Sequence, residues 1–361
     1  MNQRRPPRVV MPGPVEWLRE NLFSTPFNSA LTLVALFLIY WIVVPFVQWA
    51  VIDAAWAGTT RDACLERENG ACWPFIIQRI DQFIYGFYDV AERWRVDIVF
   101  GTLAAGLLWL TLPGMPAKRG IGALILTLFP VAAFVLLVGG FGLERIPTER
   151  WGGLIITLVV AVTGIAASLP LGILLALGRR SELPVVKGLS VAFIEFWRGV
   201  PLITVLFMAV NMLPLFMGVS VNKLLAALIA VALFSSAYMA EVVRGGLQAI
   251  PKGQYEAAAA MGLGYWQSMI FIILPQALRL SLPNIVGNFI GLLKDTSLVS
   301  IIGFFDLLGI AQVGTSDANW ATPNTALTGY VFVGAVYWAM CFSMSRYAKN
   351  LEGVLASGEK R

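Results

Sequence analysis

The chain has 361 residues; 58% are hydrophobic and only 13% are charged. About one quarter of the residues of a soluble domain are charged, so this composition excludes an ordinary water-soluble surface. Histidine is absent, which excludes a serine–histidine–aspartate triad and histidine-ligated zinc or haem. The dipeptide Gly-Lys is absent as well, so there is no GxxxxGK[ST] phosphate loop. We therefore expect no catalytic residue, metal or bound cofactor in this chain; if ATP drives it, another chain hydrolyses the ATP.

Seven uncharged runs are long enough to cross a bilayer, which takes roughly 20 mostly apolar residues. They are 21–52, 98–117, 121–143, 151–178, 199–222, 224–240 and 318–345. An eighth apolar segment, 280–303, is interrupted only by Lys294 and Asp295 near its centre. The eight segments predict an all-α membrane protein, a polytopic bundle of about eight transmembrane helices.

The first run resembles a signal peptide in one respect, because Arg4, Arg5 and Arg8 precede it and 55–57 has the form of a cleavage site. The hydrophobic region of a signal peptide is about 7–15 residues long, and this run is longer. We therefore interpret it as a retained membrane anchor.

The run 257–278 is uncharged too, and the distribution of positive charge decides against a ninth crossing. With eight crossings both termini lie on one side, and that side holds 16 of the 26 Lys and Arg residues, against 8 on the other. Positive charge in short loops stays in the cytoplasm, so both termini are predicted to be cytoplasmic. The net charge of +5 follows from these loops and gives no reason to expect nucleic-acid binding.

The stretch 53–97 is then an external insert with more acidic than basic residues. It contains Cys64 and Cys72, for which an oxidising compartment favours a disulfide. Two free thiols are the alternative, and a metal site is disfavoured because histidine is missing.

The chain divides into four parts. Residues 1–20 form a cytoplasmic tail, and 21–150 hold three spans with the insert 53–97. Residues 151–347 hold five spans with a cytoplasmic loop at 244–279, and 348–361 form a second tail.

The cytoplasmic loop predicts two short helices. Pro251 and Gly253 open the first helix, Glu256 lies near its positive amino end, four alanines at 257–260 extend it, and Gly262 ends it. We expect Pro275 to end the second helix before the next span. The alanines give the first helix a thin face that fits a groove on a partner and transmits motion; a helix lying on the inner leaflet is the alternative.

The spacing Glu256-Ala257-Ala258, Gly262, Ile272 and Leu274-Pro275 resembles the EAA loop of binding-protein-dependent ABC importer permeases. In that family the loop docks on the ATPase subunit. The resemblance implies that five residues couple this chain to an ATPase: Tyr255, Glu256, Ala257, Ala258 and Gly262.

Three further segments, 195–202, 240–247 and 293–298, are similar to the polar amino acid branch of these permeases. The resemblance covers about 151–347, and the added amino-terminal spans and insert resemble permeases of general L-amino acid uptake in Gram-negative bacteria. It implies a five-helix permease core in the bacterial inner membrane. The implied partners are a second homologous permease, an ATPase dimer that holds ATP and Mg, a periplasmic amino-acid-binding protein, membrane lipid and an amino acid substrate.

Charges at mid-membrane depth are costly and normally face protein or water. Asp295 is a candidate acceptor for a substrate ammonium group, and Lys294, Thr296 and Ser297 are candidate donors to its carboxylate. Neighbours on a helix point about 100° apart, so both charges would face one cavity only if the helix unwinds locally. Alternatively, Lys294 and Asp295 pair with neighbouring helices and fix their packing.

Glu195 and Arg198 are three residues apart, as are Glu241 and Arg244, so each pair shares a helix face. We predict a local ion pair in each case. The first pair is also a candidate for an inner gate, and the second is expected to anchor the first loop helix. Gly287 and Gly291 form a GxxxG pattern, either at a subunit seam or within one subunit.

We expect alternating access driven by ATP binding and hydrolysis on the partner. An ion-coupled secondary transporter with Asp295 at a broken helix is the main alternative. An intramembrane enzyme and an assembly scaffold are less favoured alternatives.

Overall fold

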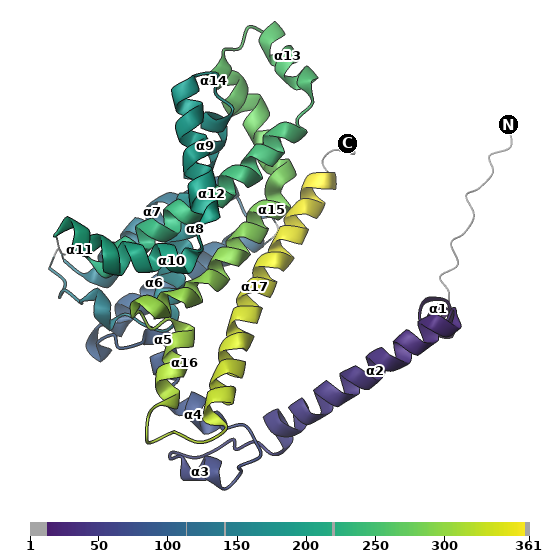
Figure 1. The fold of residues 1–361 in the computed structure, drawn as a ribbon, viewed down its shortest axis with the longest axis vertical. Coiled ribbons are helices and arrows are strands. Elements are labelled where there is room, and N and C mark those ends of the chain that lie inside the picture. Colours follow the sequence, from purple (N-terminus) through teal and green to yellow (C-terminus); the bar gives the residue numbers. More distant parts are fainter. Residues whose placement is uncertain (1–12, 113, 141, 219–220, 358–361) are drawn as a thin grey trace. The chain divides into compact units, whose positions relative to one another are not determined.

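The computed structural model describes residues 13–112, 114–140, 142–218 and 221–357 (Figure 1). This described part is helical and contains no strand beyond three isolated bridges. Its α-helices are α1 Pro14–Asn21, α2 Pro26–Val47, α3 Asp62–Leu65, α4 Trp73–Gln78, α5 Ile80–Tyr85, α6 Arg93–Thr111, α7 Lys118–Val138, α8 Leu154–Arg179, α9 Pro184–Gly199, α10 Leu202–Phe207, α11 Leu213–Met217, α12 Lys223–Ala249, α13 Lys252–Ala260, α14 Tyr265–Ser268, α15 Leu274–Asp295, α16 Leu307–Thr315 and α17 Thr325–Ser357. The prediction of an all-α, polytopic protein is confirmed.

The chain forms two compact units, and the smaller comprises 1–75 together with 322–328. Its helix α2 begins where the Thr25 side chain accepts a hydrogen bond from the Asn28 amide and where Pro26 occupies the first turn. The segment Pro26–Ile52 is apolar on all sides and long enough to span a membrane. A helix that is apolar all round and buries nothing against its own unit is suited to lipid.

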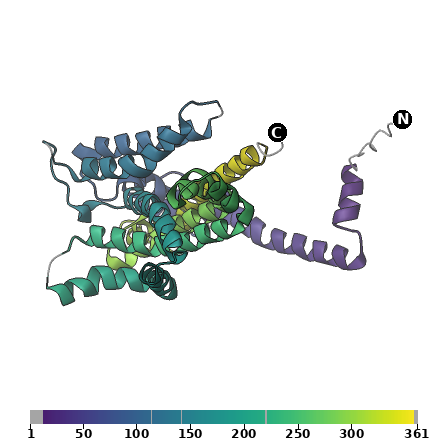
Figure 2. The ribbon, with the colours of Figure 1, turned by 90° about the horizontal axis from the view of Figure 1, so that it is seen from above.

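The larger unit comprises 76–321 and 329–361 and is a helical bundle. Helices α8, α12 and α15 pack against one another, and α6 and α7 lie side by side as a hairpin (Figures 1 and 2). Small residues allow this close packing: a Cβ atom at Gly172 of α8 would lie 2.7 Å from the Met239 side chain of α12. The short helix α13 lies at one end of this unit (Figure 1).

Seven of the described helical segments are long and apolar enough to cross a membrane, or eight if one bent pair counts as a span. That pair is Pro184–Gly199 with Leu202–Phe216, bent by 101°. The sequence predicted a span at 199–222; its start is wrong, because α9 ends at Gly199 and the helix after the bend begins at Leu202, so this region counts as a span only as the bent pair. The break falls at Val200 and Pro201, because a residue before proline is driven into extended conformation and Val200 adopts a ψ of 133°.

The prediction that Pro275 ends a helix is also wrong. One helical segment runs through it from Tyr265 to Ile302. A π-helical turn, Met269–Ile273, directly precedes α15, and Pro275 lies in the first turn of that helix. The widened turn accommodates the proline ring and its missing N–H, so the helix continues. The last helix, α17, likewise continues to Ser357, within the segment 348–361.

Candidate functional site

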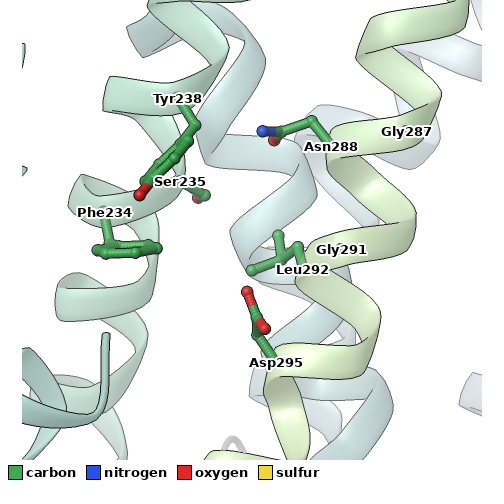
Figure 3. A pocket seen from close by; sticks show the side chains of 8 residues that line it. All are labelled: Phe234, Ser235, Tyr238, Gly287, Asn288, Gly291, Leu292 and Asp295. Atoms are coloured by element: carbon green, nitrogen blue, oxygen red, sulfur yellow. The ribbon is translucent and has the colours of Figure 1, made fainter. Parts of the chain in front are cut away.

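A cavity of about 360 Å³ opens between α12 and α15 in the larger unit (Figure 3). Its walls consist of Phe234, Ser235 and Tyr238 from α12 and Gly287, Asn288, Gly291, Leu292 and Asp295 from α15. Asp295 is the one charged side chain among these described residues. The α15 residues recur at spacings of three and four, so a single helix face supplies that wall.

Asp295 lies at the carboxyl end of α15, where the helix passes into a 3-10 segment, Thr296–Ile302. Its carboxylate points into the space between the two helices, on the side of Phe234 (Figure 3). The backbone stays helical through Asp295, so the local unwinding that would bring Lys294 and Asp295 to one cavity does not occur.

The other three predicted substrate-lining residues lie outside the cavity wall. Lys294 is exposed. Thr296 is buried, and its hydroxyl donates to the Leu293 carbonyl at 2.7 Å and lies 3.0 Å from the Tyr337 hydroxyl. Ser297 donates to the Lys294 carbonyl at 2.9 Å. The structure thus places only Asp295 of the four in the cavity.

Sequence reasoning missed the polar residues opposite and beside Asp295. Asn288 lies seven residues before Asp295 on the same face, and its Oδ1 atom is buried without a hydrogen-bond partner among the described residues. Its amide faces Tyr238 across the cavity (Figure 3). The seven-residue spacing from Asp295 was the signal that could have found it.

Gly287 and Gly291 leave the α15 face of the cavity open. A Cβ atom added at either glycine would meet nothing within 4 Å. The GxxxG pattern therefore does not seat another described helix of this chain.

Five charged side chains meet at the ends of α8, α9 and α12, and we call them the charge cluster: Arg179, Glu195, Arg198, Glu241 and Arg244. Glu241 is at its centre. Its carboxylate lies 2.9 Å from Arg179, 2.7 Å from Arg244 and 3.9 Å from Arg198. Such a mutual arrangement offsets the cost of removing these charges from water.

The pairing within the charge cluster differs in part from the predicted one. The Glu241–Arg244 contact is present, with two hydrogen bonds from the guanidinium to Oε2. Glu195 pairs with Arg179 at 2.9 Å instead of with Arg198. Arg179 was missed because its partners lie on other helices, which sequence spacing cannot show.

The segment with the predicted coupling residues forms α13, a turn and α14. Pro251 precedes the first residue of α13, as expected, and Gly262 adopts a φ of +75° in the turn that follows it, a conformation that glycine adopts readily. Glu256 and Ala257 are exposed, whereas Ala258 is buried. Apolar side chains in the turn and in α14 are also exposed, with Met261 at 76% and Trp266 at 59%.

Tyr255 attaches α13 to the ends of the long helices. Its hydroxyl donates to the Leu247 carbonyl of α12 at 3.2 Å and accepts a bond from Arg180 at 3.1 Å. The Arg180 guanidinium also lies 5.6 Å from the Tyr255 ring centre. One side chain thus ties this short helix to α12 and to the residue that follows α8.

In the smaller unit, a disulfide joins Cys64 and Cys72, whose Cα atoms are 5.3 Å apart. The Cys72 amide donates to the Thr328 hydroxyl at 2.9 Å, and the Trp56 and Trp73 rings stack. No group of three or more potential metal ligands occurs among the described residues.

A cavity that contains one carboxylate and lies between two helices long enough to span a bilayer is an arrangement found in membrane transport proteins. Comparison with known proteins makes the class more specific. Residues 168–354 match the family of binding-protein-dependent transport system inner membrane components, and the chain belongs to this family. It is therefore the permease component of an ABC transport system, located in the inner membrane.

Two relatives match nearly the whole chain. The inner membrane amino-acid ABC transporter permease protein YhdY of Escherichia coli strain K12 is 52% identical over 342 residues, covering 93% of this chain and 91% of the relative. The glutamate/glutamine/aspartate/asparagine transport system permease protein BztC of Rhodobacter capsulatus is 40% identical over 415 residues, covering 96% and 95%. The similarity therefore includes the amino-terminal spans and the insert.

Among solved structures, a chain from a crystal structure of an amino acid ABC transporter with histidines has a similar fold. The TM-score is 0.50 at 32% sequence identity, and the match covers 55% of this chain and 91% of that chain.

Proposed function

We propose that this chain is the permease of an ATP-driven amino acid importer, and that the cavity between α12 and α15 lies on the route of the amino acid. The observation that carries the proposal is the position of Asp295. Its carboxylate is the one charge on the described cavity wall, and a carboxylate is the natural acceptor for a substrate ammonium group. Two near full-length relatives bear the names of amino acid permeases, which supports the same substrate class.

In this proposal, the segment α13–α14 docks on a partner ATPase. Glu256, Ala257 and the apolar residue Met261 present an exposed surface of the kind that a partner covers. Tyr255 and Ala258 attach the segment to the bundle, and Gly262 provides the sharp turn. ATP and Mg bind to the ATPase, so movement of its two subunits is transmitted through Tyr255 to α12, which forms one wall of the cavity.

The complete importer contains a second homologous permease, an ATPase dimer and a periplasmic amino-acid-binding protein. Both termini of this chain lie in the cytoplasm, together with α13 and the charge cluster. The charge cluster, which includes Glu195, Arg198, Glu241 and Arg244, closes the cytoplasmic end of the pathway in one conformational state of the importer. Its ion pairs separate in another state. Family membership disfavours an ion-coupled secondary transporter.

The proposal is tested by co-purifying the chain with the products of neighbouring genes and reconstituting the complex in liposomes. Amino acid uptake should require ATP and the binding protein. An Asp295→Asn complex should assemble but take up substrate at least about tenfold more slowly, because a charged hydrogen bond is lost.

Glu256→Lys should abolish coupling or assembly, and Glu182→Lys is a matched control because Glu182 is equally acidic and exposed but lies between α8 and α9, outside the charge cluster. Uptake that follows an ion gradient without ATP, or full activity of Asp295→Asn, would contradict the proposal.

A further inference from the structure

Arg198 is the arginine of the charge cluster whose N–H donors are the least used by other residues. Arg179 and Arg244 each make contacts of 2.7–2.9 Å with carboxylates. Arg198 makes no hydrogen bond to any described residue, and its one ionic contact, to Glu241, is 3.9 Å long. A guanidinium has five N–H donors, and its side chain here is 36% exposed. An arginine in this state can bind an incoming anion without first breaking a strong bond.

Arg198 adjoins the cavity through Tyr238. Its guanidinium carbon lies 5.6 Å from the centre of the Tyr238 ring, and Tyr238 is part of the cavity wall. Packing over an aromatic face fixes the plane of the guanidinium and leaves its edges available for hydrogen bonds.

Asn288 offers the complementary group on the other wall. Its buried Oδ1 has no partner among the described residues, and the amide faces Tyr238 (Figure 3). A buried acceptor without a partner is costly and indicates a missing donor. An ammonium group has three such donors.

The Asn288–Tyr238 end of the cavity is separate from Asp295. Seven residues of α-helix correspond to about 10 Å, whereas the ammonium and carboxylate of an α-amino acid are joined through a single carbon. One ammonium group therefore cannot bind to Asp295 and Asn288 at once.

We propose that Arg198, Tyr238 and Asn288 form a second binding station for the amino acid, between Asp295 and the end of the bundle that carries α13. Arg198 binds the α-carboxylate, and Asn288 accepts from the ammonium. The amino acid passes from Asp295 to this station during transport, so Arg198 selects for a free carboxylate. This inference rests on the proposed function.

The test measures binding of L-glutamine and of its α-carboxamide to the purified permease–ATPase complex, without the binding protein, by equilibrium dialysis. The wild-type complex should bind glutamine about tenfold more tightly than the amide. Arg198→Gln should bring the two affinities to within about threefold of each other. Asn288→Leu should weaken both probes alike, because both carry the ammonium group.

Lys187→Gln is the matched control: it removes an exposed positive charge from the same helix, α9, that makes no ion pair to a described residue, and the preference should persist. If Arg198→Gln fails to assemble, Arg198→Lys replaces it and should reduce the preference. An unchanged preference in the assembled Arg198 variant, or equal binding of both probes by the wild type, overturns the second station. Failure of the wild type to bind either probe contradicts the proposed function itself, and the station with it.

Discussion

Tyr238 and Glu241 lie three residues apart on α12, so the ring that lines the cavity and the carboxylate at the centre of the charge cluster share one helix face. Arg198 contacts both side chains. A change in the ion pairs of Glu241 therefore acts directly on the wall of the cavity.

Replacing Glu241 with Gln should destabilise the protein. The side chain is only 17% exposed and holds Arg179 and Arg244 at hydrogen-bonding distance. Loss of its charge leaves Arg244 without its counter-ion and leaves Arg179 with Glu195 alone, at a cost of about 3 kcal/mol. Thermal unfolding of the detergent-solubilised complex measures the loss. Glu195→Gln is the control, because that side chain is 55% exposed and should contribute less than about 1 kcal/mol. Equal shifts for the two variants would contradict a central role for Glu241.

Tyr255→Phe should weaken coupling without preventing assembly. The variant loses the hydroxyl that joins α13 to the Leu247 carbonyl and to Arg180 but keeps the ring. We expect the ratio of amino acid transported to ATP hydrolysed to fall several-fold, measured in liposomes. Tyr330→Phe removes an exposed hydroxyl on α17 that makes no hydrogen bond to the described residues, so its ratio should stay at the wild-type value. A Tyr255 variant with normal coupling would show that α13 transmits motion by another contact.

Gly291→Leu should block the cavity and spare the fold of the subunit. No described atom lies within 4 Å of a Cβ atom at this position, so the larger side chain extends into the cavity. We expect uptake to fall at least about tenfold, because the leucine side chain displaces the substrate from its position in the cavity. The yield of protein should be normal. Gly334→Leu has equally open surroundings but lies on α17 away from the cavity wall, and it should transport normally. Equal activities of the two variants would place the substrate route elsewhere.

Replacing Cys64 and Cys72 with serine should loosen the smaller unit. A disulfide that closes a loop of this length contributes about 2–3 kcal/mol through the unfolded chain. Limited proteolysis should then cut near 53–75 at lower protease concentration, and a reducing agent should produce the same change in the wild type only. Cys341→Ser is the control, since that cysteine is free. Resistance of the double variant to the protease would contradict the prediction.

Asp306→Asn should remove a pH dependence of stability. Burial raises the pKa of Asp306 above its usual range, although the amides of Gly309 and Leu308 and the Tyr337 hydroxyl bond to the carboxylate and act in the opposite direction. The native state then binds this proton more tightly than the unfolded state does. The contribution of Asp306 to the free energy of unfolding is fully present below the pKa that the group has in the unfolded chain, about 4. It is lost as the pH rises through the pKa that the group has in the native state.

The wild type should accordingly lose stability relative to Asp306→Asn as the pH rises from 4, and the difference should level off above the native pKa. Melting curves of both proteins at a series of pH values measure the difference. A difference that does not change with pH, or one that moves in favour of the wild type, would contradict the raised pKa.

Much of the fold was predictable because lipid imposes a strong pattern: each span needs a run of roughly 20 mostly apolar residues, and such runs are visible in the sequence. The boundaries that failed depend on proline in its local setting. Pro201 breaks a helix because Val200 is extended, whereas Pro275 does not, because a π-helical turn precedes it. The identity of the residue does not distinguish these two cases.

The candidate site was predictable only in part. Asp295 was found because a charge in an apolar run is costly and therefore conspicuous. Asn288 and Tyr238 are uncharged and do not stand out in the sequence. They are recognised as site residues only when the structure places α12 and α15 side by side. The partner of Glu195 was mistaken because local spacing favours Arg198, while the fold brings Arg179 from another helix to the same carboxylate.

The bond from the Cys72 amide to the Thr328 hydroxyl joins residues 256 positions apart. At about 5–20 residues per second, the ribosome makes Thr328 tens of seconds after Cys72. The oxidation of the two cysteines needs only the local loop, but docking of that loop must wait for the last helix to emerge. During this interval the loop closed by Cys64 and Cys72 stays undocked, and a truncation before the last helix would leave it permanently undocked.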